Sequence, residues 1–237
     1  MVNLFKISYS FLVTMKVISK LVSTIPRKLI KPRTFNQEHY VNSLNSNTPI
    51  VFALGPAGTG KTLLASQTGI QQIVQNKFER IVLTRPASTV GETHGFLPGD
   101  INKKMYPWIQ PVFDSFAESI SYDEIERLKK RGIIEIAPLA FMRGRTFNNS
   151  WIIADEMQNS SFSQLKMLLT RLGQNSKLII TGDLAQCDID YNSLHDFIHH
   201  ASNKDVLDYI EIINLNDTDI IRHKAIAEVL SIFDDFN

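Results

Sequence analysis

The chain has 237 residues, of which 43% are hydrophobic and 21% charged, enough for one good-sized globular core or two small ones. Its 25 basic and 24 acidic side chains leave a net charge of +1, which excludes a strongly basic protein that coats DNA and an acidic disordered chain. The single cysteine, Cys187, excludes an intramolecular disulfide and a four-cysteine zinc site, and no stretch approaches the ~20 uninterrupted apolar residues of a membrane helix. We therefore expect a cytoplasmic protein without a membrane partner, located in the host cytoplasm if its genome is viral.

Residues 1–34 form a basic N-terminal arm, which we expect to be flexible. Residues 1–37 hold seven of the 25 basic residues and no Asp or Glu, which leaves 18 basic against 24 acidic residues for the remainder. Four interpretations stay open: a flexible extension, or a start codon placed too early with Met15 as the true start; a tail that binds nucleic-acid phosphates; a transit peptide; and a secretory signal. The last fits poorly, because polar residues interrupt the apolar run and no A-x-A-like cleavage site follows.

Six short apolar runs, rich in β-branched and aromatic residues, alternate with stretches of helical periodicity. Such runs are typical of strands buried on both faces of a parallel sheet. The predicted strands are 49–54, 81–83, 133–136, 151–154, 178–180 and 209–213. The predicted helices are 61–74, 162–172, 194–201 and 225–233. This alternation predicts an α/β fold with a mostly parallel sheet and helices on both faces, in one domain that spans residues 35–237.

Residues 100–131 interrupt the alternation. Pro107 and Pro111 are only four residues apart, so this insertion is expected to be a kinked or broken helix rather than one straight helix. Its aromatic side chains could stack on bases, but such a cluster is more typical of a hydrophobic core. These aromatic residues are Tyr106, Trp108, Phe113 and Phe116.

The strongest motif lies between the first predicted strand and the first predicted helix. Its glycines let the backbone fold closely around phosphate oxygens with N–H groups pointing inward, and the helix adds the positive end of its dipole. The lysine would reach the β- and γ-phosphates, and the last threonine would bind Mg²⁺. The alternative is a glycine-rich turn with an incidental lysine. The motif G-x-x-x-x-G-K-[ST] is matched by Gly55, Pro56, Ala57, Gly58, Thr59, Gly60, Lys61 and Thr62.

Polar residues follow two later predicted strands. Asp155 and Glu156 end the run 151–154, where Asp155 would be a second Mg²⁺ ligand and Glu156 would orient or deprotonate the attacking water. Acidic pairs at strand ends are also common on surfaces, so this interpretation depends on the phosphate loop. Residues 181–183 (Thr-Gly-Asp) end the next strand at the same sheet edge, and Gln186 is a candidate to sense the γ-phosphate or position water.

Five segments closely resemble the PhoH-like family of P-loop ATPases, and the resemblance runs from about residue 35 to residue 233. They read GPAGTGKT, RPASTVGETHGFLPGD, APLAFMRGRTFNNSWIIADEMQNSSFSQLKMLLTRLG, SKLIITGDLAQCDID and DIIRH. The resemblance implies a RecA-like fold related to the first motor domain of superfamily 1 helicases. It further implies that Gln37 contacts adenine, that Arg85 lines the nucleic-acid or phosphate side, that Gln186 senses the γ-phosphate and that Arg222 belongs to a carboxyl-terminal arginine motif.

The chain departs from the family pattern at two places. Residues 187–190 read Cys-Asp-Ile-Asp where the family often has Ile-Asp-Leu-Pro, and Met157 stands where alanine is usual. These departures concern the neighbouring loop and not the inferred phosphate chemistry. The chain also has no room for the amino-terminal nuclease domain that is fused to some relatives, so we expect no ribonuclease activity.

Phosphoryl transfer is accelerated ~10³–10⁵-fold by an arginine that reaches the developing charge. Helicases of this lineage close two RecA-like lobes over ATP, whereas this chain has length for one. We therefore expect a homo-oligomeric ring in which a neighbouring subunit supplies the arginine, with Arg143 or Arg145 as donor. The alternatives are Arg222 acting within its own subunit and arginines that only form surface ion pairs. The four candidates are Arg143, Arg145, Arg171 and Arg222.

The favoured function is Mg²⁺-dependent hydrolysis of ATP coupled to RNA or single-stranded DNA. The main alternative is a slow ATPase that acts as a nucleotide-dependent switch or assembly module without nucleic-acid activity. A small-molecule kinase fits less well, because the basic run 127–131 is more typical of a solvated helix than of a lid. We interpret the remaining titratable candidates as structural or surface residues, since ATP hydrolysis needs no histidine: His94, His195, His199, His200 and His223.

Overall fold

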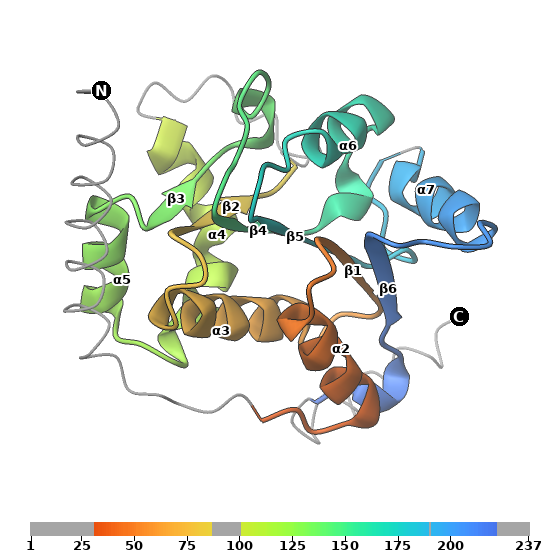
Figure 1. Ribbon diagram of the computed structural model, residues 1–237, viewed down its shortest axis with the longest axis horizontal. Helices are drawn as coiled ribbons and strands as arrows, with labels where there is room; N and C mark the ends of the chain where they lie inside the picture. Colours follow the sequence, from red (N-terminus) through yellow and green to blue (C-terminus); the bar gives the residue numbers. More distant parts are fainter. Residues whose placement is uncertain (1–30, 87–100, 190, 222–237) are drawn as a thin grey trace, which may run out of the picture.

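The computed structural model describes residues 31–86, 101–189 and 191–221. Six strands form one sheet in the order β3-β2-β4-β5-β1-β6, and every neighbouring pair is parallel (Figure 1). Each strand overlaps one of the predicted runs, so the expected parallel α/β sheet is confirmed. The strands are β1 (Ile50–Leu54), β2 (Arg80–Thr84), β3 (Ile134–Ile136), β4 (Ser150–Ala154), β5 (Lys177–Gly182) and β6 (Ile210–Asn214).

The helices agree with the predictions less evenly. The bounds of α3 are those predicted, α6 ends three residues before the predicted end at residue 172, and the helix predicted at 225–233 lies outside the described residues. The α-helices are α2 (Phe35–Asn45), α3 (Lys61–Val74), α4 (Ile101–Ala117), α5 (Tyr122–Lys130), α6 (Phe162–Leu169) and α7 (Ser193–Ser202). Short 3₁₀ helices are η1 (Leu139–Phe141), η2 (Met157–Asn159) and η3 (Asp217–Asp219).

Helix α2 was not predicted, because its buried face mixes polar and apolar residues. Gln37 and Ser43 are buried there together with Tyr40 and Leu44, so the apolar period of a helix is hidden in the sequence. The start of the helix is fixed by Thr34, whose hydroxyl accepts a hydrogen bond from the backbone N–H of Gln37.

Two hydrophobic cores cover the two faces of the sheet. Successive strand residues point to opposite faces, so Val51 and Ala53 of β1 belong to one core while Phe52 and Leu54 belong to the other. The first core is completed by side chains of α2, α3, α4 and α5, and the second by those of α6 and α7. In Figure 1, α2 and α3 lie on one side of the sheet and α6 and α7 on the other. Helices on both faces were expected from the sequence, and this arrangement is confirmed.

The insertion 100–131 differs from the prediction. Helix α4 runs through both Pro107 and Pro111, so a break at the prolines is wrong. The insertion as a whole is nevertheless broken, as expected, because α4 ends at Ala117 and α5 begins at Tyr122. Pro111 is exposed on α4. Phe113 and Phe116 are buried, which confirms the core interpretation for these two aromatics. The side chains of Tyr106 and Trp108 lie outside the described part.

A buried lysine fastens the end of α2 to the amino end of β5. The side chain of Lys177 is 3% exposed, and its Nζ donates to the carbonyl oxygens of Ser43 at 2.8 Å, Leu44 at 3.0 Å and Ser46 at 2.9 Å. These carbonyls belong to the last turn of the helix and its cap, where helical partners run out. Burial lowers the pKa of Lys177 to about 8, although the nearby Glu211 favours the charged form.

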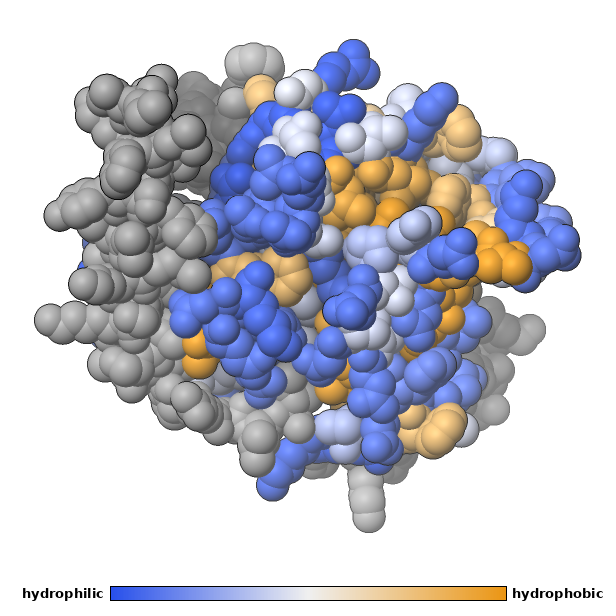
Figure 2. Space-filling view, in the orientation of Figure 1, coloured by the Kyte–Doolittle hydropathy of each residue, from blue (hydrophilic) through white to orange (hydrophobic). Residues whose placement is uncertain are grey.

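The face in Figure 2 is mostly hydrophilic, with hydrophobic side chains gathered near the region of α6 and α7. One large hydrophobic residue exposed on α6 is Phe162, at its first position. In the parts of the chain that the structure describes, none of the helices combines the length and the hydrophobicity that a membrane crossing demands.

Candidate nucleotide-binding site

The loop between β1 and α3 has a curved backbone whose conformation depends on two glycines. Gly55 has a φ of +147° and Gly60 a φ of +87°, which are favourable for glycine alone. A Cβ on Gly55 would also lie 2.3 Å from the carbonyl oxygen of Leu215, so no larger residue fits there. The hydroxyl of Thr59 is turned inward and donates to the carbonyl of Pro56 at 2.8 Å, which fixes the curve of the loop from within.

Helix α3 begins directly at this loop. Its N-cap is Gly60, and no side chain caps the first turn. The N–H groups of a first turn have no partner inside the helix, and the dipole places partial positive charge there. An anion such as phosphate is the partner that such a helix start binds best.

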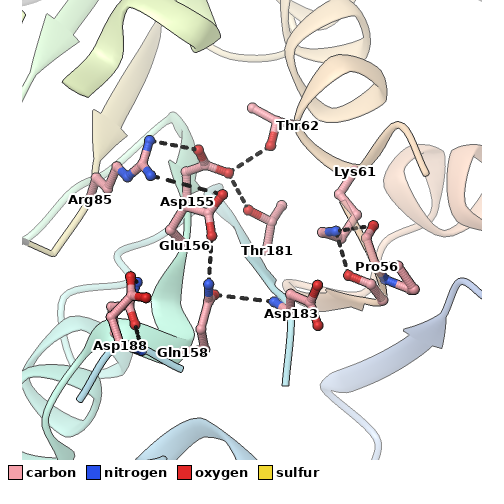
Figure 3. Close-up of polar contacts among 12 residues, drawn as sticks. Pro56, Lys61, Thr62, Arg85, Asp155, Glu156, Gln158, Thr181, Asp183 and Asp188 are labelled. Atoms are coloured by element: carbon pink, nitrogen blue, oxygen red, sulfur yellow. Dashed lines mark hydrogen bonds and ion pairs between the residues drawn. The ribbon is translucent and has the colours of Figure 1, made fainter. Parts of the chain in front are cut away.

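Lys61 lies folded across the loop. Its Nζ donates to the carbonyl oxygens of Gly55 at 2.6 Å and Pro56 at 2.8 Å (Figure 3). Burial lowers the pKa of Lys61, and the carboxylates of Asp183, Glu156 and Asp155 oppose that effect. The acidic residues that follow two neighbouring strands, β4 and β5, therefore favour a cation at this position.

Asp155 joins three elements at the carboxyl edge of the sheet. It is 4% exposed, and its Oδ1 accepts hydrogen bonds from the hydroxyls of Thr62 at 2.6 Å and Thr181 at 2.5 Å (Figure 3). The position of Thr181 follows from the register of the sheet, in which Ala154 of β4 pairs with Ile180 of β5. Sequence reasoning placed Thr181 at this edge but assigned it no contact.

Glu156 has an unusual backbone conformation. Its φ is +54° and its ψ is +40°, the left-handed region that a residue with a side chain rarely adopts. Its Oε2 accepts a 2.6 Å hydrogen bond from Nε2 of Gln158, and Gln158 Oε1 accepts in turn from the backbone N–H of Asp183 at 3.2 Å. Gln158 therefore links the ends of β4 and β5, a role that the sequence alone did not reveal.

Arg85 lies against both acidic residues. One guanidinium nitrogen is 3.9 Å from Asp155 Oδ2 and another is 3.9 Å from Glu156 Oε1 (Figure 3). Arg85 follows the end of β2, and β2 pairs with β4, so the order of the strands brings it to this position. The resemblance implies that Arg85 lines the nucleic-acid or phosphate side, and this stays a prediction; the contacts that the structure shows are those with the two carboxylates.

A cavity of about 680 Å³ opens beside the phosphate loop. Gln37 is buried at its wall, where Nε2 donates to the carbonyls of Thr59 at 3.1 Å and Asp219 at 3.4 Å. Both amide hydrogens are thus directed at protein oxygens, and the contact between Gln37 and adenine stays a prediction. Residues that line the cavity include Arg33, Gln37, Gly58, Gly60, Gln67 and Ile221.

Tyr40 connects the same helix to the phosphate loop. It is fully buried, and its hydroxyl donates to the carbonyl of Lys61 at 3.2 Å. Burial and the charge of Asp155 raise the pKa of Tyr40, so its hydroxyl stays protonated.

The remaining predicted residues are exposed, have partners outside this site or lie outside the described residues. Gln186 is exposed in the turn after β5, where its N–H donates to the carbonyl of Asp183 at 3.2 Å. Arg143 is exposed, whereas Arg145 pairs with Glu135 at 2.5 Å. Arg171 donates to the carbonyl oxygens of Met167 and Arg145. Arg222, His94 and His223 lie outside the described residues.

The three described histidines of the sequence prediction lie on α7. His195 is 3.3 Å from the carboxylate of Asp196, and the rings of His199 and His200 meet edge to face. Within residues 31–86, 101–189 and 191–221, no three or more His, Cys, Asp or Glu side chains form a group that could hold a metal ion.

Comparison with known proteins identifies the family. The family model described as PhoH-like protein matches residues 29–234. Among structures, the Pif1 helicase from Candida albicans has a TM-score of 0.41 at 16% identity, covering 88% of this chain and 44% of that one, and we draw nothing about activity from it.

Three relatives carry the same name or nearly so. The PhoH-like protein of Bacillus subtilis is 42% identical over 210 residues, and that of Mycobacterium tuberculosis (strain H37Rv) is 41% identical over 206 residues. Protein PhoH of Escherichia coli (strain K12) is 41% identical over 162 residues. These alignments cover 89%, 87% and 68% of this chain but only 66%, 58% and 46% of the relatives. With a family model that spans most of its length and relatives at this level of identity, the chain belongs to the PhoH-like protein family of P-loop ATPases.

Proposed function

We propose that this chain binds ATP together with Mg²⁺ and hydrolyses the bond to its terminal phosphate. The observation that carries the proposal is the 2.6 Å hydrogen bond from Thr62 to Asp155, which brings the phosphate loop and the acidic end of β4 to one point. Family membership supports nucleotide binding independently of this geometry.

The donor set at this point fits Mg²⁺. A threonine hydroxyl and a carboxylate are hard oxygen ligands, and Mg²⁺ in phosphate sites usually takes one or two protein oxygens beside phosphates and water. Thr62 and Asp155 would hold the ion, which would neutralise charge on the phosphates. The N–H groups of residues 55–62 would bind the phosphate oxygens, and Lys61 would move from the carbonyls of its own loop to the β- and γ-phosphates.

Glu156 is the proposed base that orients or deprotonates the attacking water. Its side chain is 39% exposed, so water reaches it, while Gln158 and Arg85 set its direction. Gln186 would sense the γ-phosphate from the turn after β5. Arg222, which the resemblance assigns to a carboxyl-terminal arginine motif, is the alternative source of positive charge, acting within its own subunit.

Coupling of hydrolysis to RNA or single-stranded DNA is the finer part of the proposal. The excess of basic residues in 1–37 supports it, because lysine and arginine neutralise a nucleic-acid backbone. The alternative is a slow nucleotide switch without nucleic-acid activity. The kinase alternative is weakened, because two of the basic residues that could have formed a lid pair within α5 instead: Arg127 with Glu124 and Lys129 with Glu126.

ATP turnover with and without poly-RNA or single-stranded DNA tests the proposal. We expect turnover to be stimulated by one polymer and abolished in the variants Lys61→Ala and Glu156→Gln. Lys77→Ala, which removes an exposed lysine just beyond α3, is the matched control and should leave turnover unchanged. Turnover that no polymer changes would favour the nucleotide switch. Unchanged turnover in Lys61→Ala would contradict the assigned site.

A ring of subunits is proposed as the assembly, with residues 1–34 as an arm and residues 35–237 as the ATPase domain. Arg143 is the better donor to a neighbouring site, because it is exposed while Arg145 is held by Glu135 and by the ring of Phe147. Arg143→Ala and Lys61→Ala should each be inactive alone but regain turnover when mixed, since one variant supplies the intact loop and the other the arginine. No recovery on mixing, or only monomers by mass photometry with ATP and Mg²⁺, would overturn this assembly.

A further inference from the structure

The carboxylate of Asp219 is fully buried and is held by donors from two distant parts of the chain. It accepts hydrogen bonds from the hydroxyl of Thr34, from Nδ2 of Asn36 at 2.9 Å and from the backbone N–H of Asn216 at 2.8 Å. Burial opposes ionisation of this group, but the hydrogen bonds lower the pKa of Asp219 below its ordinary value. The charged carboxylate therefore binds η3 to the start of α2.

The main chain of the same segment is bound to the phosphate loop. The carbonyl of Asp219 accepts from Nε2 of Gln37 at 3.4 Å, and the same nitrogen donates to the carbonyl of Thr59 at 3.1 Å. Two residues further on, the N–H of Ile221 donates to the carbonyl of Gly58 at 3.2 Å. Residues 34–37, 58–60 and 219–221 are thus joined in one network with Asp219 at its centre.

These three segments form part of the wall of the cavity beside the phosphate loop. Its lining includes Gln37 from the first segment, Gly58 and Gly60 from the second, and Ile221 from the third, together with Arg33 just before the first segment. A volume of about 680 Å³ is ordinary for a pocket that holds a small ligand. Because the phosphates are assigned to the loop at one side of this cavity, the ribose and base of the nucleotide are the groups that would enter it.

We infer that Asp219 is a positioning residue for the nucleoside half of the nucleotide. This inference rests on the proposed function, in which ATP occupies the phosphate loop. Asp219 would not touch the nucleotide; it would act through Gln37 and Ile221 by holding the cavity wall in place. The curve of the phosphate loop is also held from within by Thr59, whose hydroxyl donates to the carbonyl of Pro56, so we expect the binding of phosphates alone to be independent of Asp219.

Asp219→Asn is an informative substitution, because asparagine keeps the shape of the aspartate side chain and replaces one acceptor oxygen with an NH₂ donor. That donor would face the hydroxyl of Thr34 or the amide of Asn36, both of which donate to Asp219. We expect Asp219→Asn to bind ATP about tenfold more weakly, the effect of one lost hydrogen bond to a charged group. Inorganic tripolyphosphate, which has no nucleoside, should bind as in the unaltered protein.

Isothermal titration with ATP and with tripolyphosphate, both in Mg²⁺ buffer, measures this difference. Asp217→Asn is the matched control, because Asp217 lies on the same 3₁₀ turn with an exposed side chain; it should bind both ligands normally. Equal weakening of both ligands in Asp219→Asn would show a general structural role and overturn the inference, as would unchanged ATP binding. Failure of the unaltered protein to bind either ligand would instead contradict the proposed function.

A second variant keeps the test valid if Asp219→Asn does not fold. Asn36→Ala removes one donor to Asp219 and leaves Thr34, which caps α2, in place. We expect about threefold weaker ATP binding with unchanged tripolyphosphate binding, since one neutral partner of a charged group is lost. Normal affinity of Asn36→Ala for ATP, or a matching loss of affinity for tripolyphosphate, would contradict the inference.

Discussion

The hydroxyl of Thr62 donates a 2.6 Å hydrogen bond to Asp155 Oδ1, which joins the first turn of α3 to the end of β4. The same oxygen accepts from Thr181, so three elements meet at one carboxylate. If Mg²⁺ binds there, the ion would take the place of a hydrogen bond that already holds its two ligands together. The geometry of the ligands would then be set before the metal arrives.

Asp155→Asn tests this pair. Asparagine keeps the shape and one carbonyl oxygen but removes the charge, so the variant should need at least about tenfold more Mg²⁺ for half-maximal ATP binding, equivalent to ~1.4 kcal/mol. Titration of Mg²⁺ at fixed ATP with a fluorescent nucleotide measures the shift. Asp123→Asn, an exposed position on α5, serves as control. An unchanged Mg²⁺ requirement in Asp155→Asn would remove Asp155 from the metal site.

Arg85 is expected to compete with the metal for the same carboxylates. Its guanidinium nitrogens are 3.9 Å from Asp155 and 3.9 Å from Glu156, so its charge reduces the negative potential that attracts a divalent ion. Arg85→Gln should therefore lower the Mg²⁺ concentration for half-maximal ATP binding about two- to fivefold, the size of a partly exposed ion pair.

Arg80→Gln is the control for that measurement. Arg80 lies at the start of β2, the strand that Arg85 follows, but it pairs with Glu135, so its loss should leave the Mg²⁺ requirement unchanged. A higher Mg²⁺ requirement in Arg85→Gln than in the unaltered protein would mean that Arg85 supports metal binding instead of opposing it.

Lys177 should make the stability of the protein depend on pH in the alkaline range. Burial lowers its pKa to about 8, whereas in an unfolded chain lysine titrates near ~10.4. Between these values the unfolded chain binds more protons at this residue than the folded chain, so the stability contributed here rises with pH.

The comparison of the unaltered protein with Lys177→Met isolates this residue, since other titrating groups are common to both. From pH 8 to pH 10 the free energy of unfolding of the unaltered protein should rise by about 2 kcal/mol relative to the variant. Denaturant titrations at several pH values give both curves. A difference that stays constant or falls over this range would contradict the lowered pKa.

Gly69→Ala should destabilise the protein although alanine favours helices. A Cβ at Gly69 would lie 2.7 Å from Cδ1 and Nε1 of Trp151, whose indole N–H is bound to the carbonyl of Ala65 at 3.1 Å. Instead of a gain of ~1 kcal/mol from helix propensity, we expect a loss of ~1–3 kcal/mol from overpacking, measured by denaturant unfolding. In the double variant with Trp151→Phe the loss from Gly69→Ala should shrink; strictly additive effects would show that the two residues do not clash.

Most of the fold could be predicted because each strand is a continuous apolar run bounded by polar residues. The strand order was beyond prediction, because contacts such as that between β1 and β5 join segments that no local pattern relates. Helix α2 was missed because Gln37 and Ser43 are polar yet buried. For the insertion, local proline chemistry predicted a kink or a break, but the break falls after Ala117, and the helix that contains both prolines packs Phe113 and Phe116 into the core.

The candidate site likewise contains residues that the sequence predicts and residues that it does not. Residues 55–62, Asp155 and Glu156 stand in local patterns whose chemistry is readable, and the structure brings Thr62 and Asp155 into contact. Gln158 and Asp219 carry no such pattern, since their importance lies in partners that are far away in the chain. Asp219 stands in the segment DIIRH, in which the sequence offered only Arg222 and His223 as candidates.

Helix α2 is bound at both of its ends to opposite edges of the sheet. Near its start Gln37 holds the phosphate loop at the carboxyl edge, and its last turn is closed by Lys177 at the amino edge. Eleven residues of helix span roughly 16 Å, so one rigid rod connects the two edges. The helix should consequently open and close as a single cooperative unit, and bound nucleotide should slow amide hydrogen exchange along its whole length. Mutations at the amino edge, far from any phosphate, would then alter nucleotide affinity by changing how often this unit opens.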